Sequence, residues 1–599
     1  MNLLTNMALT TLKKLKCEII NSLNDDKSIF SVFYNLISRE LKAFLNFFYS
    51  WAQNYYKVFL LLIIIIGFFI RFPYIKSGLP YLNNSDEVHI AGRAIKILQT
   101  GDFNPHWFNY PSLTINLVLP FYVLNYFRLM GNGRLTALED ITIGWETLAH
   151  GSINYPSFYA VGRLVIALIA ILSIFLIYEV GKRYFNKKVG LISALILIFF
   201  PFHIRWSTII RPDMIVTFFV LLSLFFLSLY IEKGRVKFII LAGLSAGLTT
   251  STKYNSFLII APLILGILAY SNRKFRDICV ISSASAFGFL LGCPYSVFDL
   301  NNFLADAGYE AYHYRVRGHQ GAQATPGIEQ LKFFLSHFKN WINNIFHIKK
   351  IWNLSLMGTL ICLILYIKNF LIIFSFPVLY LFYMSQQKVN FIRNMVCITP
   401  FVALSIGIAL YYFYRILIAS LNFFRRKKLF RSRINRDVIF IGWLLILLIF
   451  LRPIGAIKSA YQYKKTYKET RTKAVEYVRD NFPNAKIGIS KELKIHPYDL
   501  DKVQNKVLFN TEKVSLINLY EKNFDYIISS NKYFYYNVQK RTKYSHNLEE
   551  LERKFPEQNI IKAFGDGSVV IDFLSKEPRI NIYKVNKAFL NAKYIKKIQ

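Results

Sequence analysis

Two adjacent carboxylates, Asp86 and Glu87, follow the first long apolar segment of the chain, residues 57–72. A charged group beside a membrane is costly to desolvate, so an acidic pair at this place indicates that its charge is needed. Such a carboxylate can act as a general base by accepting a proton from an attacking hydroxyl. It can instead coordinate a divalent cation, because hard cations favour carboxylate oxygens. A third reading, a solvated loop whose acids cap a helix, also fits these residues.

The composition of the chain indicates the elements that must position this pair. Of the 599 residues, 54% are hydrophobic and only 18% are charged. Soluble chains are about one quarter charged, so this chain is expected to be a membrane protein. Apolar segments long enough to cross a bilayer recur through residues 57–453 and then stop. They are 57–72, 161–180, 189–204, 214–231, 236–250, 257–270, 278–297, 351–367, 370–384, 395–421 and 438–451. We therefore expect a cytoplasmic amphipathic segment at 1–56, an α-helical polytopic membrane domain at 57–453 and a separate domain at 454–599.

The basic residues of the loops predict the orientation of this domain. One set of loops is rich in Lys and Arg, at residues 182–188, 233–237, 273–276, 368 and 425–436. The loops between them hold few basic residues, so the positive-inside rule places the first set in the cytoplasm. This alternation holds only if segment 113–129 lies in the membrane surface instead of crossing. The result is about eleven spans, with Asp86, Glu87 and the C-terminal domain on the extracytoplasmic side.

The C-terminal part, residues 454–599, has the pattern of a small α/β domain. We expect a helix at 470–482, strands at 486–490, 506–510 and 526–530, and further helices at 514–523 and 547–555. No glycine-rich phosphate loop follows these strands, so nucleotide binding is not indicated. A structural or acceptor-docking role is expected.

Charge and cysteine content exclude other classes. The net charge of +38 is explained by cytoplasmic loops that face anionic lipid headgroups, so no nucleic acid partner is expected. The five cysteines show no disulfide framework and no metal-binding spacing.

Several motifs follow the acid pair in a fixed order. They are GDFNPHWFNYPS at 101–112, VGRL at 161–164, HIRWSTIIRPD at 203–213, STKYN at 251–255 and FIRN at 391–394. This order resembles the family 39 glycosyltransferases, which are the protein-mannosyltransferase and aminoarabinose-transferase relatives of the GT-C superfamily. The resemblance extends over roughly residues 57–400.

The resemblance implies a GT-C-like bundle in the plasma (inner) membrane of a bacterium. It implies transfer of a sugar, with inversion, from a polyprenyl-phosphate carrier to an extracytoplasmic acceptor. Asp86 would be the general base, and Glu87 its neighbour or a ligand of a divalent cation, since two adjacent acids raise the pKa of one of them. Arg393 and Lys253 would hold the carrier phosphate, although each could also be a side chain reaching the interface from a helix end.

Three further residues are candidates for donor or carrier contacts. Asp213 would orient Lys253 or the acceptor, or simply help to start the helix that follows Pro212. His106 and His319 would contact sugar or acceptor, or be solvated loop histidines.

The acceptor is an envelope glycan, a lipid or a protein. No β-trefoil insertion is recognisable between the later spans, which favours a glycan or lipid. The sequence does not distinguish a hexose from a pentose as the transferred sugar.

Two other classes of protein compete with the glycosyltransferase hypothesis. A multi-pass transporter or flippase of a lipid-linked sugar would have charges near the middle of its spans and paired repeats. A non-catalytic membrane scaffold would present the C-terminal domain and have no turnover.

Overall fold

The computed structural model describes residues 56–80, 82, 84–143, 153–319, 322–345, 351–426, 439–444, 470–490, 505–509, 524–530, 560–564, 570–572, 575–576 and 580–584. The chain forms two units, residues 1–62 with 411–450 and residues 63–410 with 451–599. The domain boundaries expected after residues 56 and 453 stay predictions. The amphipathic segment expected at 1–56 lies outside the described residues, except for Tyr56.

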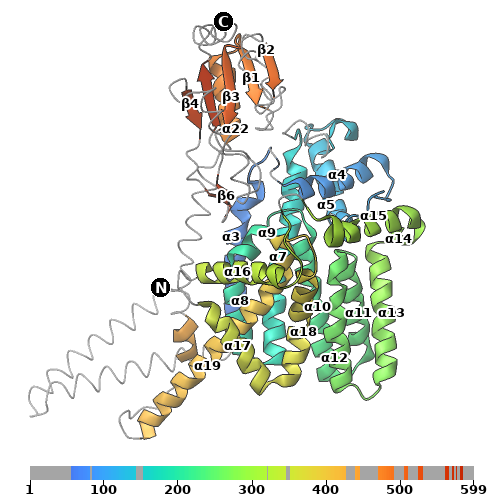
Figure 1. The fold of residues 1–599 in the computed structure, drawn as a ribbon, viewed down its shortest axis with the longest axis vertical. Coiled ribbons are helices and arrows are strands. Elements are labelled where there is room, and N and C mark those ends of the chain that lie inside the picture. The colour runs from blue at the N-terminus through green and yellow to red at the C-terminus, as the bar shows by residue number, and fades with distance from the viewer. Residues whose placement is uncertain are drawn as a thin grey trace, which may run out of the picture. The chain divides into compact units, whose positions relative to one another are not determined.

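Long apolar helices dominate the described part of the chain (Figure 1). Ten of them coincide with apolar segments that the sequence predicts as spans. They are α3 (Tyr56–Arg71), α7 (Pro156–Tyr184), α8 (Lys187–Ile198), α10 (Pro212–Lys233), α11 (Val236–Thr250), α12 (Ile260–Tyr270), α13 (Lys274–Gly292), α17 (Ile351–Leu365), α18 (Ile367–Ser385) and α19 (Thr399–Arg426). An eleventh predicted segment, 438–451, is described only at residues 439–444, which are helical.

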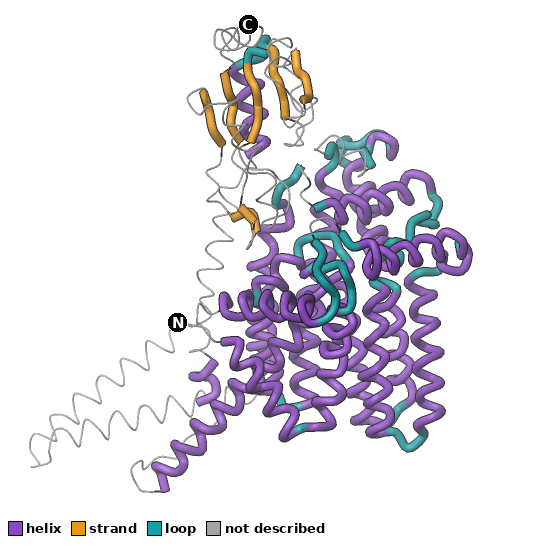
Figure 2. Tube along the Cα trace, in the orientation of Figure 1, coloured by secondary structure: helices purple, strands orange, loops and turns teal. Residues whose placement is uncertain are grey.

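Other helices and turns connect these apolar helices (Figure 2). The helices are α4 (Ser85–Thr100), α5 (Leu113–Gly131), α9 (Pro201–Trp206), α14 (Tyr295–Phe298), α15 (Leu300–Tyr312) and α16 (Ile328–Ile345). The tighter or wider turns are η1 (Phe72–Lys76), η2 (Leu138–Asp140), η3 (Tyr254–Ile259), the π-helical η4 (His313–Arg317) and η5 (Ile392–Ile398). By length and composition, seven described helices can cross a membrane, and three shorter ones are similarly apolar. The polytopic helical architecture is therefore confirmed.

Contacts between helices define one end of this bundle, which we call the Asp86 end. The first turns of α7 and α10 lie at this end. Glu87 accepts hydrogen bonds from Arg163 of α7 and from the backbone of Ile210, just before α10. Helix α11 ends here too, because Lys253 pairs with Asp213 in the first turn of α10. Lys182 and Arg183, two of the basic residues that the sequence assigns to the cytoplasm, lie in the last turn of α7, at the opposite end.

Helix α5 lies across the Asp86 end. The backbone nitrogen of Leu113, its first residue, donates to the carbonyl of Ser251, which follows α11 (3.1 Å). Near its other end, Asn125 donates to the hydroxyl of Ser157 at the start of α7 (3.1 Å). A helix of this length is about 28 Å long, so a crossing helix would reach opposite ends of the bundle. The apolar composition of α5 would allow a span, but its contacts support the predicted surface position.

Small residues bring α11 and α13 into close contact. A Cβ added to Gly247 would lie 2.0 Å from the carbonyl oxygen of Ser285, and one added to Gly288 would lie 2.4 Å from that of Leu244. Backbones approach in this way in membrane bundles, where packing replaces the hydrophobic effect as the source of association.

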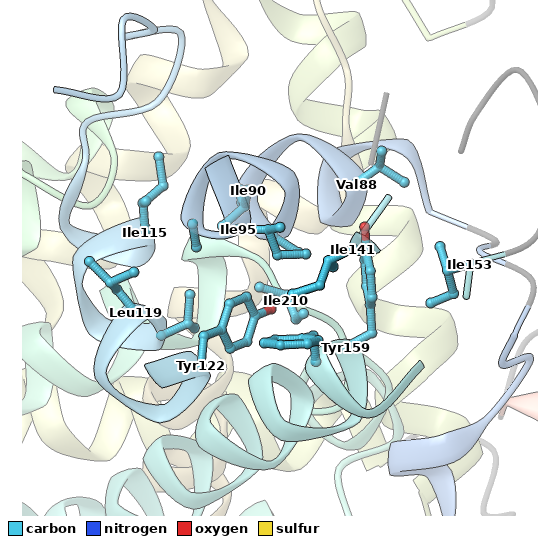
Figure 3. Close-up of a cluster of buried hydrophobic side chains, with 14 of the residues drawn as sticks. Val88, Ile90, Ile95, Ile115, Leu119, Tyr122, Ile141, Ile153, Tyr159 and Ile210 are labelled. Atoms are coloured by element: carbon cyan, nitrogen blue, oxygen red, sulfur yellow. The ribbon is translucent and has the colours of Figure 1, made fainter. Parts of the chain in front are cut away.

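An apolar cluster fixes α4, which carries Asp86 and Glu87 in its first turn. The face with Val88, Ile90 and Ile95 packs against α5 and against Tyr159 of α7 (Figure 3). The side chain of Asn84 caps the first turn by accepting from the backbone of Asp86 (3.1 Å). At the other end Gly101 adopts the left-handed conformation (φ 71°) that commonly terminates a helix.

The C-terminal domain is a mixed five-stranded sheet in the order β2-β1-β3-β7-β4. Its strands are β1 (Lys486–Ser490), β2 (Asn505–Phe509), β3 (Tyr526–Ser530), β4 (Ile560–Phe564) and β7 (Ile580–Lys584). The two short strands β5 (Val570–Asp572) and β6 (Ser575–Lys576) pair with each other.

Strand β1 pairs in parallel with β2 and β3, whereas β7 pairs antiparallel with β3 and β4. Helix α22 (Thr470–Asn481) packs on the sheet through Ala474, Val475 and Val478. The predicted helix and first three strands are confirmed. The helices expected at 514–523 and 547–555 lie outside the described residues.

Candidate functional site

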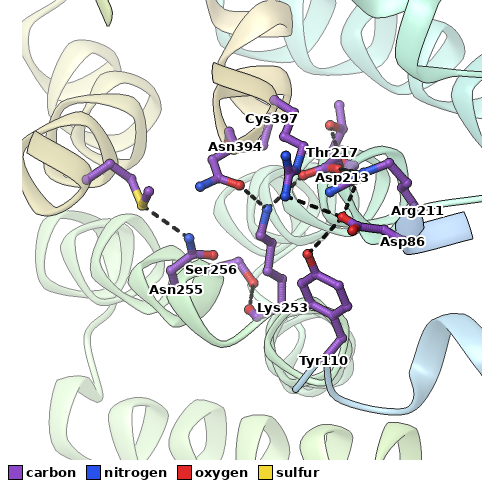
Figure 4. Close-up of polar contacts among 12 residues, drawn as sticks. Asp86, Tyr110, Arg211, Asp213, Thr217, Lys253, Asn255, Ser256, Asn394 and Cys397 are labelled. Carbon is purple, nitrogen blue, oxygen red and sulfur yellow. Dashed lines mark hydrogen bonds and ion pairs between the residues drawn. The ribbon is translucent and has the colours of Figure 1, made fainter. Parts of the chain in front are cut away.

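Asp86 lies at the centre of an ionic cluster at this end of the bundle (Figure 4). Its Oδ2 forms ion pairs with Arg211, just before α10, and with Arg393 in η5 (3.3 Å). The hydroxyl of Tyr110 donates to the same oxygen (3.3 Å). The Asp86 side chain is still 19% exposed, so the carboxylate is accessible as well as anchored.

The cluster keeps Asp86 ionised. Burial alone would raise the pKa of Asp86, but the guanidinium groups of Arg211 and Arg393 outweigh it and hold the pKa below its usual range. The adjacent acid pair predicts the opposite shift, a pKa raised by Glu87. For Asp86 the two neighbouring cations outweigh any effect of the adjacent acid. Burial and the Asp86 charge both raise the pKa of Tyr110, so its hydroxyl stays a hydrogen-bond donor.

Glu87 points into a different environment. Its carboxylate is fully buried and accepts two hydrogen bonds of 2.7 Å from Nε and Nη2 of Arg163. It also accepts from the backbone nitrogen of Ile210 (3.2 Å), while Arg163 donates to the carbonyls of Ile75 and Ser77. The pair ties α4 to α7 and η1. This geometry does not support the expected catalytic part of Glu87, because both oxygens are engaged and shielded from solvent.

Asp213 and Lys253 form a second, buried pair beside Asp86. Asp213 accepts from Nε of Arg211 (3.0 Å) and from Nζ of Lys253 (2.7 Å). The same ammonium donates to Oδ1 of Asn394 (2.7 Å), next to Arg393 in η5. Asp213 is thus joined directly to Lys253, and its part in orienting Lys253 or the acceptor stays a prediction. Lys253 is 6% exposed and holds α10, α11 and η5 together, so its geometry favours positioning over direct phosphate contact.

Arg393 is the more accessible of the two predicted carrier-binding cations. Its side chain is 16% exposed, and its guanidinium carbon lies 3.5 Å from the centre of the Phe391 ring. Its Nε makes no hydrogen bond within the described residues. A guanidinium that is stacked, partly exposed and incompletely bonded can donate hydrogen bonds to a phosphate oxygen.

The two histidines lie in different places. His106 is on the surface, with its side chain 57% exposed, and bonds Asp102 (2.8 Å) and Asn104 within its own loop. These contacts hold His106 within its loop, and its contact with sugar or acceptor stays a prediction. His319 packs against the Phe391 ring at 4.7 Å, which brings it beside Arg393, and it lines a cavity described below. Burial, followed by neighbouring His313, lowers the pKa of His319.

The sequence did not predict roles for Arg211, Tyr110, Arg163 and Asn394. Arg211 carried a signal, because it is one of few basic residues in the loops assigned to the extracytoplasmic side. Tyr110 and Asn394 belong to motifs of the resemblance but have no distinguishing chemistry of their own. The partner of Glu87 is 76 residues away, and nothing in the sequence connects the two.

The expected divalent cation does not fit the acid pair. Asp86 is bonded by guanidinium groups, and both oxygens of Glu87 are taken up by Arg163. Among the described residues, no group of three or more His, Cys, Asp or Glu side chains is placed to hold a metal ion.

Comparison with known proteins agrees with this chemistry over part of the chain. A family model described as dolichyl-phosphate-mannose-protein mannosyltransferase matches residues 159–298, from α7 to α14. None of the curated proteins compared matches the chain. The predicted resemblance to protein mannosyltransferases is thus confirmed over residues 159–298.

Solved structures of similar fold are also found. ArnT from Cupriavidus metallidurans in the apo state aligns with 90% of this chain and 99% of its own, at 12% identity and a TM-score of 0.47. The oligosaccharyltransferase of Archaeoglobus fulgidus, tethered with an acceptor peptide, aligns with 84% of this chain and 72% of its own, at 12% identity and a TM-score of 0.46. The S. cerevisiae protein O-mannosyltransferase complex aligns with 42% of this chain and 33% of its own, at 17% identity and a TM-score of 0.30.

Proposed function

We propose that the chain is an integral-membrane glycosyltransferase that moves a sugar from a polyprenyl-phosphate carrier to a hydroxyl of an extracytoplasmic acceptor, with inversion. One observation carries the proposal: an ionised, partly exposed carboxylate, Asp86, is paired with a partly exposed guanidinium, Arg393. A base and a phosphate-binding cation are the two groups that this transfer needs. The family match to mannosyltransferases named for a lipid-phosphate donor supports the donor class.

In this reaction Asp86 accepts the proton of the acceptor hydroxyl. The hydroxyl oxygen forms a bond to the anomeric carbon from one side, and the bond from that carbon to the phosphate oxygen breaks on the other. The bonding electrons leave with the carrier phosphate, whose growing charge Arg393 stabilises. An ion pair with the phosphate would weaken the hold of Arg393 on Asp86. The pKa of Asp86 would then rise, which makes it a better base once the donor is bound.

Neighbouring groups position this pair. Tyr110 and Arg211 fix Asp86, while Lys253 and Asn394 fix the turn of η5 that carries Arg393. The reaction would take place outside the cytoplasm, because Lys182 and Arg183, which the positive-inside rule assigns to the cytoplasm, lie at the end of α7 away from Asp86. The acceptor would be an envelope glycan, a lipid or a protein.

A flippase of a lipid-linked sugar is the second candidate. Its charges should line a path through the middle of the bundle. The described ionic cluster around Asp86 is instead confined to one end, which favours transfer over transport.

The experiment uses the full chain in lipid nanodiscs with a panel of polyprenyl-phosphate hexoses and pentoses. Mass spectrometry of envelope glycans from cells with and without the chain identifies the natural product. Release of polyprenyl phosphate that requires the chain supports the proposal. Movement of an intact lipid-linked sugar across a liposome bilayer, without cleavage, would refute it in favour of the flippase.

A further inference from the structure

A cavity lies where α15 passes into η4 and the loop that follows it. Its volume is about 550 Å³, within the range of small-ligand sites. The lining side chains share polar edges or aromatic faces, and they are Tyr309, Glu310, His313, Arg317, His319 and Gln323. Apart from His319, none of them is a site residue predicted from the sequence.

The lining has the chemistry of a saccharide site. The rings of Tyr309 and His313 stack with their centres 6.1 Å apart and an angle of 26° between them. Tyr309 is 43% exposed, so its ring can offer an aromatic face to the C–H face of a sugar, because aromatic faces are electron-rich, while Arg317 donates to its hydroxyl. Around it, Glu310 and Gln323 offer acceptors, and Gln323 and Arg317 offer donors, which matches hydroxyl groups that do both. A phosphate fits less well, because Glu310 would repel it.

Two chains of contacts join the cavity to Asp86. His319 packs on Phe391 at 4.7 Å, Arg393 lies over the same ring at 3.5 Å, and Arg393 pairs with Asp86 at 3.3 Å. One aromatic ring and one guanidinium therefore separate the cavity from the carboxylate.

The second chain of contacts runs through the loop before α5. Glu310 accepts a hydrogen bond from Asn109 (2.9 Å). The next residue, Tyr110, donates to Asp86. A ligand in the cavity that touches Glu310 is thus linked to the hydrogen bond that holds the base.

We propose that this cavity is the acceptor subsite and that it takes the terminal sugar of a glycan or glycolipid. Tyr309 and His313 would stack on the sugar, and Glu310 and Gln323 would bond its hydroxyls. One hydroxyl would extend past His319 toward Asp86. This assignment rests on the proposed function and adds the chemical class of the acceptor to it.

The test compares Tyr309→Ala with Tyr312→Ala, each in the full chain in nanodiscs. Tyr312 is an exposed tyrosine of the same helix that does not line the cavity. The probes are the methyl and octyl glycosides of common hexoses, and binding is measured by saturation-transfer-difference NMR. We expect Tyr309→Ala to weaken binding about tenfold or more, as loss of a stacked ring should, and Tyr312→Ala to leave it unchanged. Gln323→Leu is a second variant, expected to weaken binding too.

The outcomes separate this proposal from the function it rests on. Equal binding by the wild type and both cavity variants, or no binding by the wild type, would overturn the subsite. A raised KM of Tyr309→Ala for the lipid-linked donor would also overturn it, because the cavity would then be a donor site.

Donor hydrolysis by water should persist in Tyr309→Ala. If the wild type binds glycosides through Tyr309 but never cleaves a donor, the proposed function fails while the saccharide site stands. Binding of octyl glycosides alone would identify a glycolipid acceptor.

Discussion

Replacement of Glu87 by Gln tests whether this carboxylate stabilises the fold or takes part in the reaction. Glu87 and Arg163 are 0% and 6% exposed, and two hydrogen bonds of 2.7 Å join them. The amide oxygen of Gln can still accept from Arg163 and Ile210, but its NH2 group would face the second guanidinium donor. The variant therefore loses one charge-assisted bond, about 1.5–3 kcal/mol, and leaves a buried guanidinium without its anion. Breaking a buried pair on one side costs about 3–5 kcal/mol in total.

This loss should appear in stability before it appears in chemistry. In nanodiscs, Glu87→Gln should unfold several degrees below the wild type, while sugar transfer per folded molecule stays near normal at low temperature. Glu139→Gln is the matched control, because Glu139 is exposed and the same change there should have almost no effect. The double variant Glu87→Leu with Arg163→Met should recover much of the lost stability, since it leaves no buried charge.

One result would refute this reasoning. If Glu87→Gln unfolds at the wild-type temperature but has lost sugar transfer, Glu87 takes part in the reaction and its buried pair does not stabilise the fold.

Three more variants examine the site and the bundle. Arg393→Met removes a cation that lowers the pKa of Asp86, so the pKa of Asp86 should rise. In a plot of kcat/KM against pH, the acid limb should then move to higher pH. An acid limb at the wild-type pH would contradict the ion pair. Tyr110→Phe removes one hydrogen bond to Asp86 and should slow transfer about three- to tenfold without unfolding the chain. Full activity of this variant would show that the hydrogen bond is unimportant for transfer. Gly247→Ala should destabilise the bundle by about 1–3 kcal/mol, because its Cβ would meet the Ser285 carbonyl. Gly308→Ala is the control, because nothing lies within 4 Å of a Cβ at that position. Equal unfolding temperatures for the two variants would contradict the close packing.

The sequence predicted the elements better than the contacts between their side chains. The lengths of the apolar segments located the long helices, and the alternation of basic loops indicated that segment 113–129 lies in the membrane surface, because both signals depend on local composition. Strands β1 and β3 were also readable as short apolar runs. Strand β7 has a weak signal, with Ile580 and Ile582 alternating with polar residues over five positions.

The division between Asp86 and Glu87 could not be read from the sequence. The two residues were predicted as a pair in a loop, but they lie in the first turn of α4. Neighbouring residues of a helix point in different directions, so the two acids face different partners. Which cations they meet depends on Arg163, Arg211 and Arg393, which tertiary packing brings to α4 from three distant segments.

Replacement of Asp86 by Asn tests the central claim most directly. The variant and the wild type are compared in nanodiscs by release of polyprenyl phosphate from a donor that the wild type cleaves. Asp102→Asn, an exposed acid of the loop that follows α4, serves as the control. The account predicts that Asp86→Asn stays folded and inserted but loses transfer by about 10²-fold or more, as expected for removal of a general base, while Asp102→Asn stays active. Wild-type transfer by folded Asp86→Asn would contradict it.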